Sequence, residues 1–315
     1  MKAEMLWRRT AAMLLTLWIG VFCMAVTASA RGNVDTGKEA SLSVYFGDGG
    51  AGFSNVKFDI YRVANISDTG DYTLTGDFQR YPVSLDNLDS SGWRALAQTL
   101  AAYAVRDGLN PLQAKKTGAD GQAGFSKLTV GLYLITGDFY EKEGTTYTPE
   151  PMLISLPSLT EKDEWLYDVE VSCKFDSETI PAFVERKVQK VWKDDGKEDK
   201  RPKQISVQLL ENGTIVDTVV LSKENNWEYT WENLDGGSRW QVTEAEVPDG
   251  YTVAITQERT VFIMTNTRHS ESPPKLPQTG MLWWPVPMLV CCGLLLIVIG
   301  LIVRYRHGGN NENER

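Results

Sequence analysis

The stretch KVQKVW at residues 187–192 decides the fold of the second half of the chain. In an extended strand its alternation places Val188, Lys190 and Trp192 on one face. Further strand-like runs follow, separated by Gly, Asn and Asp clusters; they lie at residues 207–209, 227–231, 240–242 and 261–264. Short strands at regular spacing, with turn signals between them, predict an immunoglobulin-like β-sandwich over residues 181–269.

Three polar residues of this sandwich fall on apolar strand faces: Lys190, Glu244 after WQVT, and Asn266 after VFIMT. Burying a lone charge is costly, so these side chains must satisfy one another. A desolvated lysine amine becomes a nucleophile, and a buried carboxyl stays protonated and polarises a carboxamide. The pattern therefore predicts a Lys190–Asn266 isopeptide bond, assisted by Glu244 and formed with loss of ammonia. The alternative is that Lys190 extends to solvent and Asn266 caps a turn.

The same residues resemble the collagen-adhesin B-type (Cna B-type) domain of Gram-positive surface proteins. The resemblance covers roughly residues 183–268, through KVWKDD, RPKQISVQLLENG, NNWEYTWENL, VPDGY and MTNT. It implies that Lys190 and Asn266 are the bond partners and that Glu244 is the assisting acid. Residues 240–251 also resemble the E-box of pilins, with Trp240, Val242, Ala245 and Val247 as departures from its pattern.

The preceding residues, 31–178, predict a second all-β domain of the same class with one helical insertion. Asp89 offers a helix cap, Trp93, Leu96, Leu100 and Tyr103 fall on one helix face, and Gly108 ends the helix. We expect that face to pack on a sheet, and residues 178–181 to link the two domains. A faint internal repeat aligns residues 128–137 with 234–244 and puts Gly137 where Glu244 stands. We therefore predict no internal Lys–Asn isopeptide bond in the first domain. The carboxyl group of Asp138, next to Gly137, leaves open whether the first domain has a cross-link of its own.

The end of the first domain, WLYDVEVSCK, resembles the pilin motif of sortase-assembled fimbriae. Trp165, Val169, Val171 and Lys174 keep the motif's spacing, whereas a Ser and a Cys replace its Tyr and Pro. In that family the lysine accepts the threonine of the next subunit, which implies Lys174 as the polymerisation acceptor. The alternative is an ordinary surface lysine after an edge strand.

Both ends of the chain indicate export. Residues 1–30 read as a signal peptide, with basic residues, an apolar run and an A-x-A site. After a short tether at 270–275 comes LPQTG, which consists of Leu276, Pro277, Gln278, Thr279 and Gly280. An uncharged run at 282–303 is long enough to span a bilayer, and basic residues open the cytoplasmic tail at 304–315.

This tail resembles the LPXTG sorting signal, at which a sortase, a membrane-bound cysteine transpeptidase, cuts after the threonine. The resemblance implies peptidoglycan anchoring at Thr279 and a membrane-bound precursor. The alternative is a plain C-terminal membrane anchor.

Composition narrows the function further. The chain carries a formal charge of −9, and both terminal segments are net positive, so the exported part is more acidic still. Such a surface argues against nucleic acid as a partner. Only Cys173 lies between the two termini, which precludes an internal disulfide. With two histidines in the chain and no calcium-loop motif, we expect no metal site and no cofactor.

As a whole the chain resembles small two-domain pilin-like proteins of the SpaA type. The resemblance implies a fimbrial (pilus) subunit that is exported, internally cross-linked, polymerised by sortase and linked to the wall of a Gram-positive bacterium. Its expected partners are sortase, peptidoglycan and other pilin subunits, with the membrane involved only before sorting. The alternative is a monomeric wall-anchored adhesin, or a minor tip or basal pilin, that binds a host or bacterial surface ligand. Residues arranged for enzymatic turnover are not apparent in the sequence.

Overall fold

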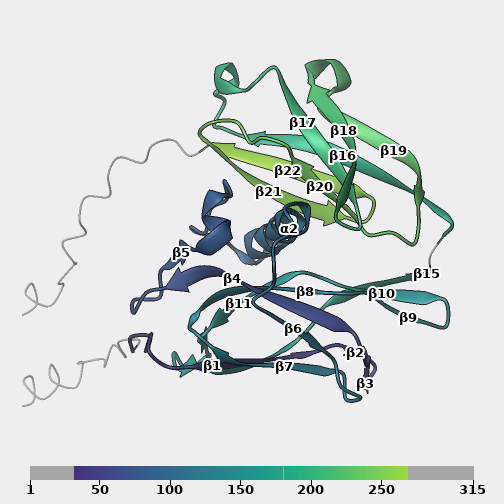
Figure 1. Ribbon diagram of the computed structural model, residues 1–315. Helices are drawn as coiled ribbons and strands as arrows, with labels where there is room; N and C mark the ends of the chain where they lie inside the picture. Colours follow the sequence, from purple (N-terminus) through teal and green to yellow (C-terminus); the bar gives the residue numbers. More distant parts are fainter. Residues whose placement is uncertain (1–31, 180, 269–315) are drawn as a thin grey trace, which may run out of the picture. The chain divides into compact units, whose positions relative to one another are not determined.

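The computed structural model describes residues 32–268 apart from residue 180 (Figure 1). Strands dominate this part, and α2 (Ser90–Arg106) is its one α-helix, which confirms the predicted all-β class with a helical insertion. Within these residues no helix is long and apolar enough to cross a membrane. The expected signal peptide, tether, sorting signal and membrane span lie outside the described residues.

The N-terminal part is a sandwich of two main sheets. Its strands are β1 (Ala40–Tyr45), β4 (Lys57–Ile66), β5 (Tyr72–Leu74), β6 (Gln113–Lys116), β7 (Gln122–Leu128), β8 (Gly131–Gly137), β11 (Met152–Leu156) and β14 (Asp168–Ser172). One sheet has the order β14-β1-β7 and the other β11-β8-β4-β5, with β6 also paired to β4. Apolar side chains such as Phe58, Phe125 and Tyr133 form a core between them.

Shorter elements complete this part. They are β2 (Gly47–Asp48), β3 (Ala51–Gly52), η1 (Gly76–Arg80), β9 (Tyr140–Lys142), β10 (Thr145–Pro149), β12 (Ser158–Leu159), β13 (Trp165–Leu166) and β15 (Phe175–Thr179). The predicted link at 178–181 begins later than expected, because the edge of β10 gives Glu178 and Thr179 strand partners in Thr146 and Thr145.

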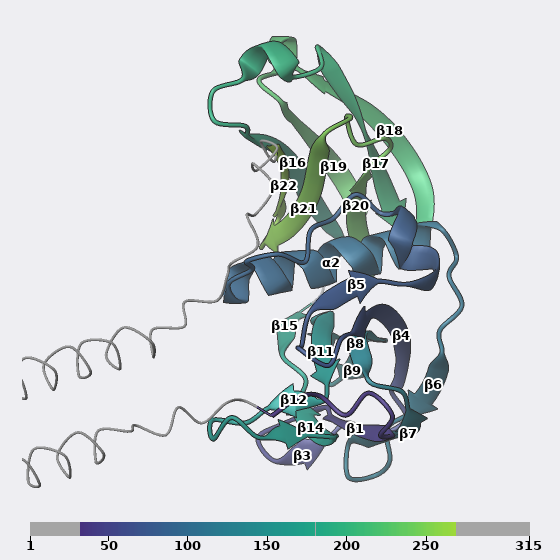
Figure 2. The same cartoon turned by 90° about the vertical axis from the view of Figure 1, so that its left-hand side faces the viewer.

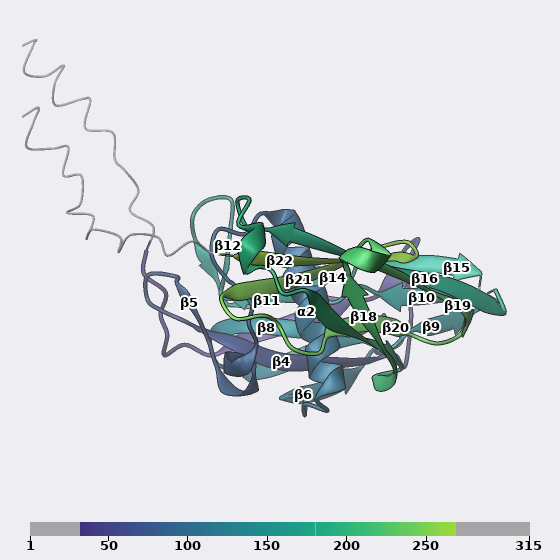
Figure 3. The same cartoon turned by 90° about the horizontal axis from the view of Figure 1, so that it is seen from above.

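The C-terminal part is a two-sheet sandwich, as its alternation predicted. Its strands are β16 (Phe183–Lys193), β17 (Gln204–Glu211), β18 (Thr214–Ser222), β19 (Glu228–Asp235), β20 (Trp240–Glu244), β21 (Tyr251–Glu258) and β22 (Val261–Arg268), with short 3-10 turns η2 (Glu198–Lys200) and η3 (Lys223–Asn225). The sheets have the orders β19-β16-β22-β21 and β18-β17-β20. The first and last strands, β16 and β22, pair in parallel, and Figure 3 shows β22 beside β21.

Helix α2 begins as predicted, with the Asp89 carboxylate accepting the Gly92 N–H at 2.7 Å. We expected only one face of this helix to pack on a sheet, and that expectation is incomplete. The helix packs against β8 and β11 of the N-terminal part and also against β20 and β21 of the C-terminal sandwich (Figure 2). The second contact uses polar residues, among them Gln98 and Thr99, which a pattern of large apolar side chains does not reveal.

Candidate functional site

Lys190, Glu244 and Asn266 meet in the interior of the C-terminal sandwich. They come from β16, β20 and β22, and all three are buried, as the alternation predicted. Lys190 Nζ lies 2.9 Å from Glu244 Oε2, and both side chains have no exposed area. Asn266 Nδ2 donates to Glu244 Oε1 at 3.2 Å. The Glu244 carboxyl group therefore bridges the lysine of the first strand and the asparagine of the last.

The Asn266 carboxamide has a second possible orientation. Its Oδ1 is buried and has no hydrogen-bond partner among the described residues. A half-turn about the Cβ–Cγ bond exchanges oxygen and nitrogen, a choice that the hydrogen-bond network alone decides. After that turn a protonated Glu244 donates to Oδ1, which satisfies the oxygen and draws electrons from the amide carbon. Protonation of Glu244 thus favours the orientation that makes Asn266 an electrophile.

Burial shifts both ionisable groups of the cluster toward their neutral forms. Burial lowers the pKa of Lys190 to about 8, although the Glu244 charge acts in the opposite direction. Burial also raises the pKa of Glu244 above its ordinary value, against the effects of Lys190 and Asn266. Both shifts arise because a low-dielectric interior disfavours charged groups. The cluster thus combines a nucleophilic amine, a carboxylic acid and a carboxamide, which is the set that amide exchange requires.

Aromatic side chains surround the lysine. Its Nζ lies 4.8 Å from the centroid of the Trp192 ring. Trp192 packs edge-on against both Trp227 and Tyr251, each at 5.3 Å between ring centroids. The Tyr251 hydroxyl donates to Asp194, which is held by a two-pronged ion pair with Arg201 at 2.6 and 2.8 Å. The tyrosine that ends the predicted E-box, Tyr251, therefore supports the Trp192 ring that covers Lys190.

The candidate acceptor Lys174 lies between β14 and β15, and it is exposed. Its backbone oxygen accepts the Glu150 N–H at 2.8 Å, which fixes the chain at that point. Of the other residues of the predicted motif, Val169 is buried, Val171 is half-buried, and Trp165 donates from Nε1 to the Gly32 oxygen at 2.5 Å. Lys174 thus presents its amine to solvent from a held backbone.

Cys173, the neighbour of Lys174, is buried. Burial, together with the Glu150 charge, raises the pKa of its thiol to about 12. Because the thiolate is the reactive form, this shift disfavours reaction of the cysteine at neutral pH.

Gly137, which the internal repeat aligns with Glu244, lies at the end of β8. A Cβ at this position would overlap the ring of Phe58. The Phe58 ring therefore occupies the space that a side chain equivalent to that of Glu244 would need.

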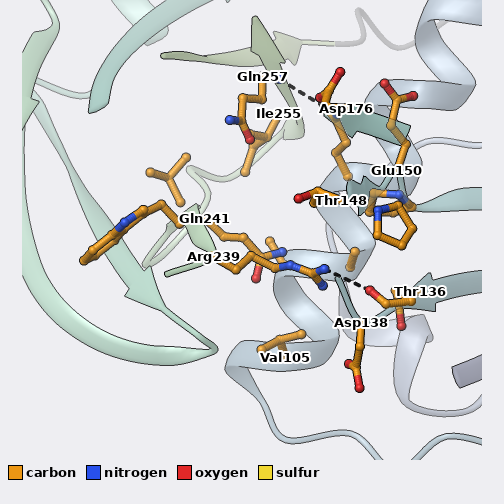
Figure 4. Close-up of a pocket in the computed structure, with 18 of the residues that line it drawn as sticks. Val105, Thr136, Asp138, Thr148, Glu150, Asp176, Arg239, Gln241, Ile255 and Gln257 are labelled. Atoms are coloured by element: carbon orange, nitrogen blue, oxygen red, sulfur yellow. Dashed lines mark hydrogen bonds between the residues drawn. The ribbon is translucent and has the colours of Figure 1, made fainter. Parts of the chain in front are cut away.

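A cavity of about 210 Å³ lies where α2, β8 and β10 approach β20 and β21 (Figure 4). The Arg239 guanidinium reaches into it and donates from Nη2 to the Gly137 oxygen at 2.8 Å. Burial lowers the pKa of Arg239, and the charge of Asp138 opposes that effect. Neither the cavity nor Arg239 was apparent from the sequence, because the lining residues come from distant segments. The volume is below the roughly 300 Å³ at which ligand pockets usually start.

Comparison with known proteins identifies both domains. Residues 23–174 match the family described as Gram-positive pilin subunit D1, N-terminal domain, and residues 186–267 match the Cna protein B-type domain. The collagen adhesin of Staphylococcus aureus is 29% identical over 104 residues, which cover 31% of this chain and 9% of that protein. The chain thus spans about a tenth of the length of this curated relative.

Solved structures give weaker likenesses. The single B1 repeat unit of the S. aureus collagen-binding protein is 17% identical, with a TM-score of 0.27 over 74% of this chain and 99% of that one. The major pilin SpaD of Corynebacterium diphtheriae is 12% identical, with a TM-score of 0.28 over 76% and 100%. The pilus protein RrgB of Streptococcus pneumoniae is 13% identical, with a TM-score of 0.26 over 76% and 67%. Scores at this level do not establish a common fold.

The two family matches cover the candidate site residues of the described part of the chain. The pilin match ends at Lys174, and the B-type match contains Lys190, Glu244 and Asn266. The chain is thus similar over most of its length to structural proteins of the Gram-positive surface. Its residues 23–174 are similar to a Gram-positive pilin D1 domain, and its residues 186–267 are similar to a Cna B-type domain.

Proposed function

We propose that sortase polymerises this chain into a pilus by joining Thr279 of one copy to Lys174 of the next. The enzyme breaks the Thr279–Gly280 amide and holds the threonine carbonyl as a thioester. The Lys174 amine attacks that carbonyl, releases the enzyme thiol and forms an isopeptide bond. The observation that carries this proposal is the exposed Lys174 at the end of the pilin D1 match, with LPQTG further along the same chain.

The proposal includes a second, internal bond. Lys190 Nζ attacks Cγ of Asn266, the C–N bond of the carboxamide breaks, and the nitrogen leaves as ammonia. Glu244 donates a hydrogen bond to the carboxamide oxygen and transfers the amine proton to the leaving nitrogen. The 2.9 Å contact with Lys190 supports the proton transfer, and the 3.2 Å contact with the Asn266 carboxamide supports the hydrogen bond once that carboxamide has turned. Because the bond forms once per molecule, we propose no enzymatic turnover.

An immunoblot of cell-wall extract, boiled in detergent, tests polymerisation. We expect a ladder of regularly spaced heavy species, which Lys174→Arg abolishes and Lys162→Arg leaves intact. Lys162 is an exposed lysine of the same domain, so it is a matched control. Mass spectrometry of the ladder should find a branched peptide that joins Thr279 to Lys174.

A single band near monomer size would overturn the shaft-subunit proposal. The chain would then be a wall-anchored adhesin or a minor pilin, a function that the match to a collagen adhesin favours.

Intact mass tests the internal bond. We expect the wild-type chain to be lighter than its sequence by one ammonia, and Glu244→Ala to keep the full mass. Asn266→Ala is the control that cannot form the bond under any mechanism. A wild-type chain of full mass would rule the internal bond out.

A further inference from the structure

Glu244 ends β20, which is the edge strand of its sheet, and the side of the sandwich that it borders is covered by α2 of the first domain. The Glu244 backbone oxygen accepts a long hydrogen bond, 3.5 Å, from Arg106 Nη1 of this helix. Beside it lies an open groove of about 540 Å³, lined in part by Arg80, Tyr103 and Glu244 itself. The acid of the cluster is therefore fully buried and yet close to a route for water.

Tyr103 is the large side chain of α2 at this place. It is 1% exposed, its ring stacks on that of Tyr81 with centroids 4.7 Å apart, and the Arg106 guanidinium lies 4.6 Å from its centroid. Asp107 holds both neighbours, because it accepts from the Tyr81 hydroxyl at 2.8 Å and from Arg106 Nε at 2.7 Å. Tyr103 is thus fixed in one position on the wall of the groove that Glu244 also lines.

We infer that α2 of the first domain is the wall that keeps water out of the Lys190–Glu244–Asn266 cluster, with Tyr103 as the positioning residue. The inference rests on the proposed internal bond and adds a condition to it. On this side the sandwich ends in β20 and β21, which are edge strands of two different sheets, and α2 packs against both of them. The internal bond therefore forms fast only in a chain whose first domain has folded and docked.

The mechanism of this effect is electrostatic. Besides Lys190, the titratable or charged groups that face Glu244 or line its groove are Tyr103, Arg106 and Asp107 on α2 and at its end, and Arg80 and Tyr81 before it. Water that passes from the groove to the buried cluster lowers the pKa of Glu244 and raises that of Lys190, because it stabilises both charged forms. The fraction of neutral pairs, which alone can react, falls about tenfold for each unit by which the gap between the two pKa values widens.

The test measures bond formation in the full chain. Wild-type protein and variants are collected after a short pulse of expression, and the loss of ammonia is followed by intact mass across a pH series. We expect Tyr103→Ala to slow the reaction at least about tenfold, for one unit of pKa change. Its pH–rate profile should also be broader, because the two limiting pKa values move apart. Tyr103→Phe keeps the ring and should match the wild type.

Two further variants keep the test decisive. Leu96→Ala removes a buried side chain from the same face of α2, two turns away, and should leave rate and profile unchanged. Tyr103→Leu retains apolar bulk and should show a smaller change in the same direction if the alanine variant does not fold. Wild-type rate and profile in both Tyr103→Ala and Tyr103→Leu overturn the inference alone. A wild-type chain that keeps its ammonia overturns the proposed bond, and the inference with it.

Discussion

At the scale of single residues, the cluster is an unfavourable arrangement until it reacts. A lysine and a glutamate without exposed area lose the hydration of both charges, and one ion pair offsets that loss only in part. Formation of an amide removes both the amine and the need to ionise it. A bond between Lys190 and Asn266 therefore relieves the cost that burial creates, and it does so in a domain that contains no cysteine.

The unreacted cluster should reveal itself in the pH dependence of stability. Asn266→Ala blocks the bond and leaves Lys190 beside Glu244. Lys190 has a folded pKa of about 8, whereas an unfolded lysine titrates near 10.4. Between these values the unfolded chain binds a proton that the folded chain does not, so the free energy of unfolding rises with pH, by up to about 1.4 kcal/mol per unit.

Urea denaturation of Asn266→Ala at a series of pH values checks this expectation. The matched control is the double variant Lys190→Met with Asn266→Ala. In this variant the free energy of unfolding should no longer rise with pH above a pH of about 8. Parallel curves for the two variants would mean that Lys190 keeps its proton in the folded state.

At the scale of elements, α2 covers an exposed strand edge. Strand β21 pairs with β22 on one side, and its other side faces the helix. There the Ile255 N–H donates to Thr99 Oγ1 at 2.7 Å and the Gln257 N–H to Gln98 Oε1 at 3.0 Å. Just before the helix, the Pro82 oxygen accepts the Val253 N–H at 2.9 Å. These bonds satisfy the backbone donors that an edge strand would otherwise leave open.

Thr99→Val tests this edge cover. Valine fills the same space and has no acceptor, so the buried Ile255 N–H loses its partner. We expect the free energy of unfolding to fall by about 1–3 kcal/mol, measured by urea denaturation. Thr99→Ser keeps the hydroxyl and should be less destabilising, even though it removes a methyl group. The edge cover would be of little importance if serine proved the more damaging of the two.

At the scale of the whole molecule, the two proposed bonds define a path for tension. In a polymer, force enters a subunit at Lys174 and leaves at Thr279, so it passes through the second domain and bypasses the residues before Lys174. The internal bond joins β16 to β22, the first and last strands of that path, which pair in parallel. This geometry gives a physical reason for a cross-link in the second domain.

Docking of the helix on the second sandwich can be measured at Gly213. This residue lies in the turn between β17 and β18 with φ of +89°, and a Cβ there would overlap Cγ1 of Val105 on α2. Gly196 has a similar φ of +78°, and a Cβ added there would have no atom within 4 Å. Alanine at either glycine costs about 1–2 kcal/mol of backbone strain, and only Gly213→Ala adds a clash of roughly 1–3 kcal/mol.

A double-mutant cycle on the free energy of unfolding separates the two costs. Val105→Ala should recover most of the excess loss in Gly213→Ala and none of the loss in Gly196→Ala. If Gly213→Ala and Gly196→Ala lower the free energy of unfolding equally, and Val105→Ala restores none of it, the helix does not pack on this turn.

Much of the site could be predicted from the sequence, because strand alternation is a local property. A two-residue period places Lys190, Glu244 and Asn266 on apolar faces whatever the partner strands are. Asp89 likewise predicted the start of α2 through a contact only three residues long. The end of β15 was missed, since Thr179 is in a strand only because β10 lies beside it.

The sequence by itself determined the strand classes, the burial of the three reactive side chains and the start of the helix, since each depends on neighbours within a few residues. Tertiary structure alone decided that α2 covers the second sandwich and that Tyr103 borders Glu244. Arg106 and Glu244, which mark that contact, are 138 positions apart. A contact across such a separation leaves no periodic signal in the chain, because its two sides are brought together only by the packing of whole domains.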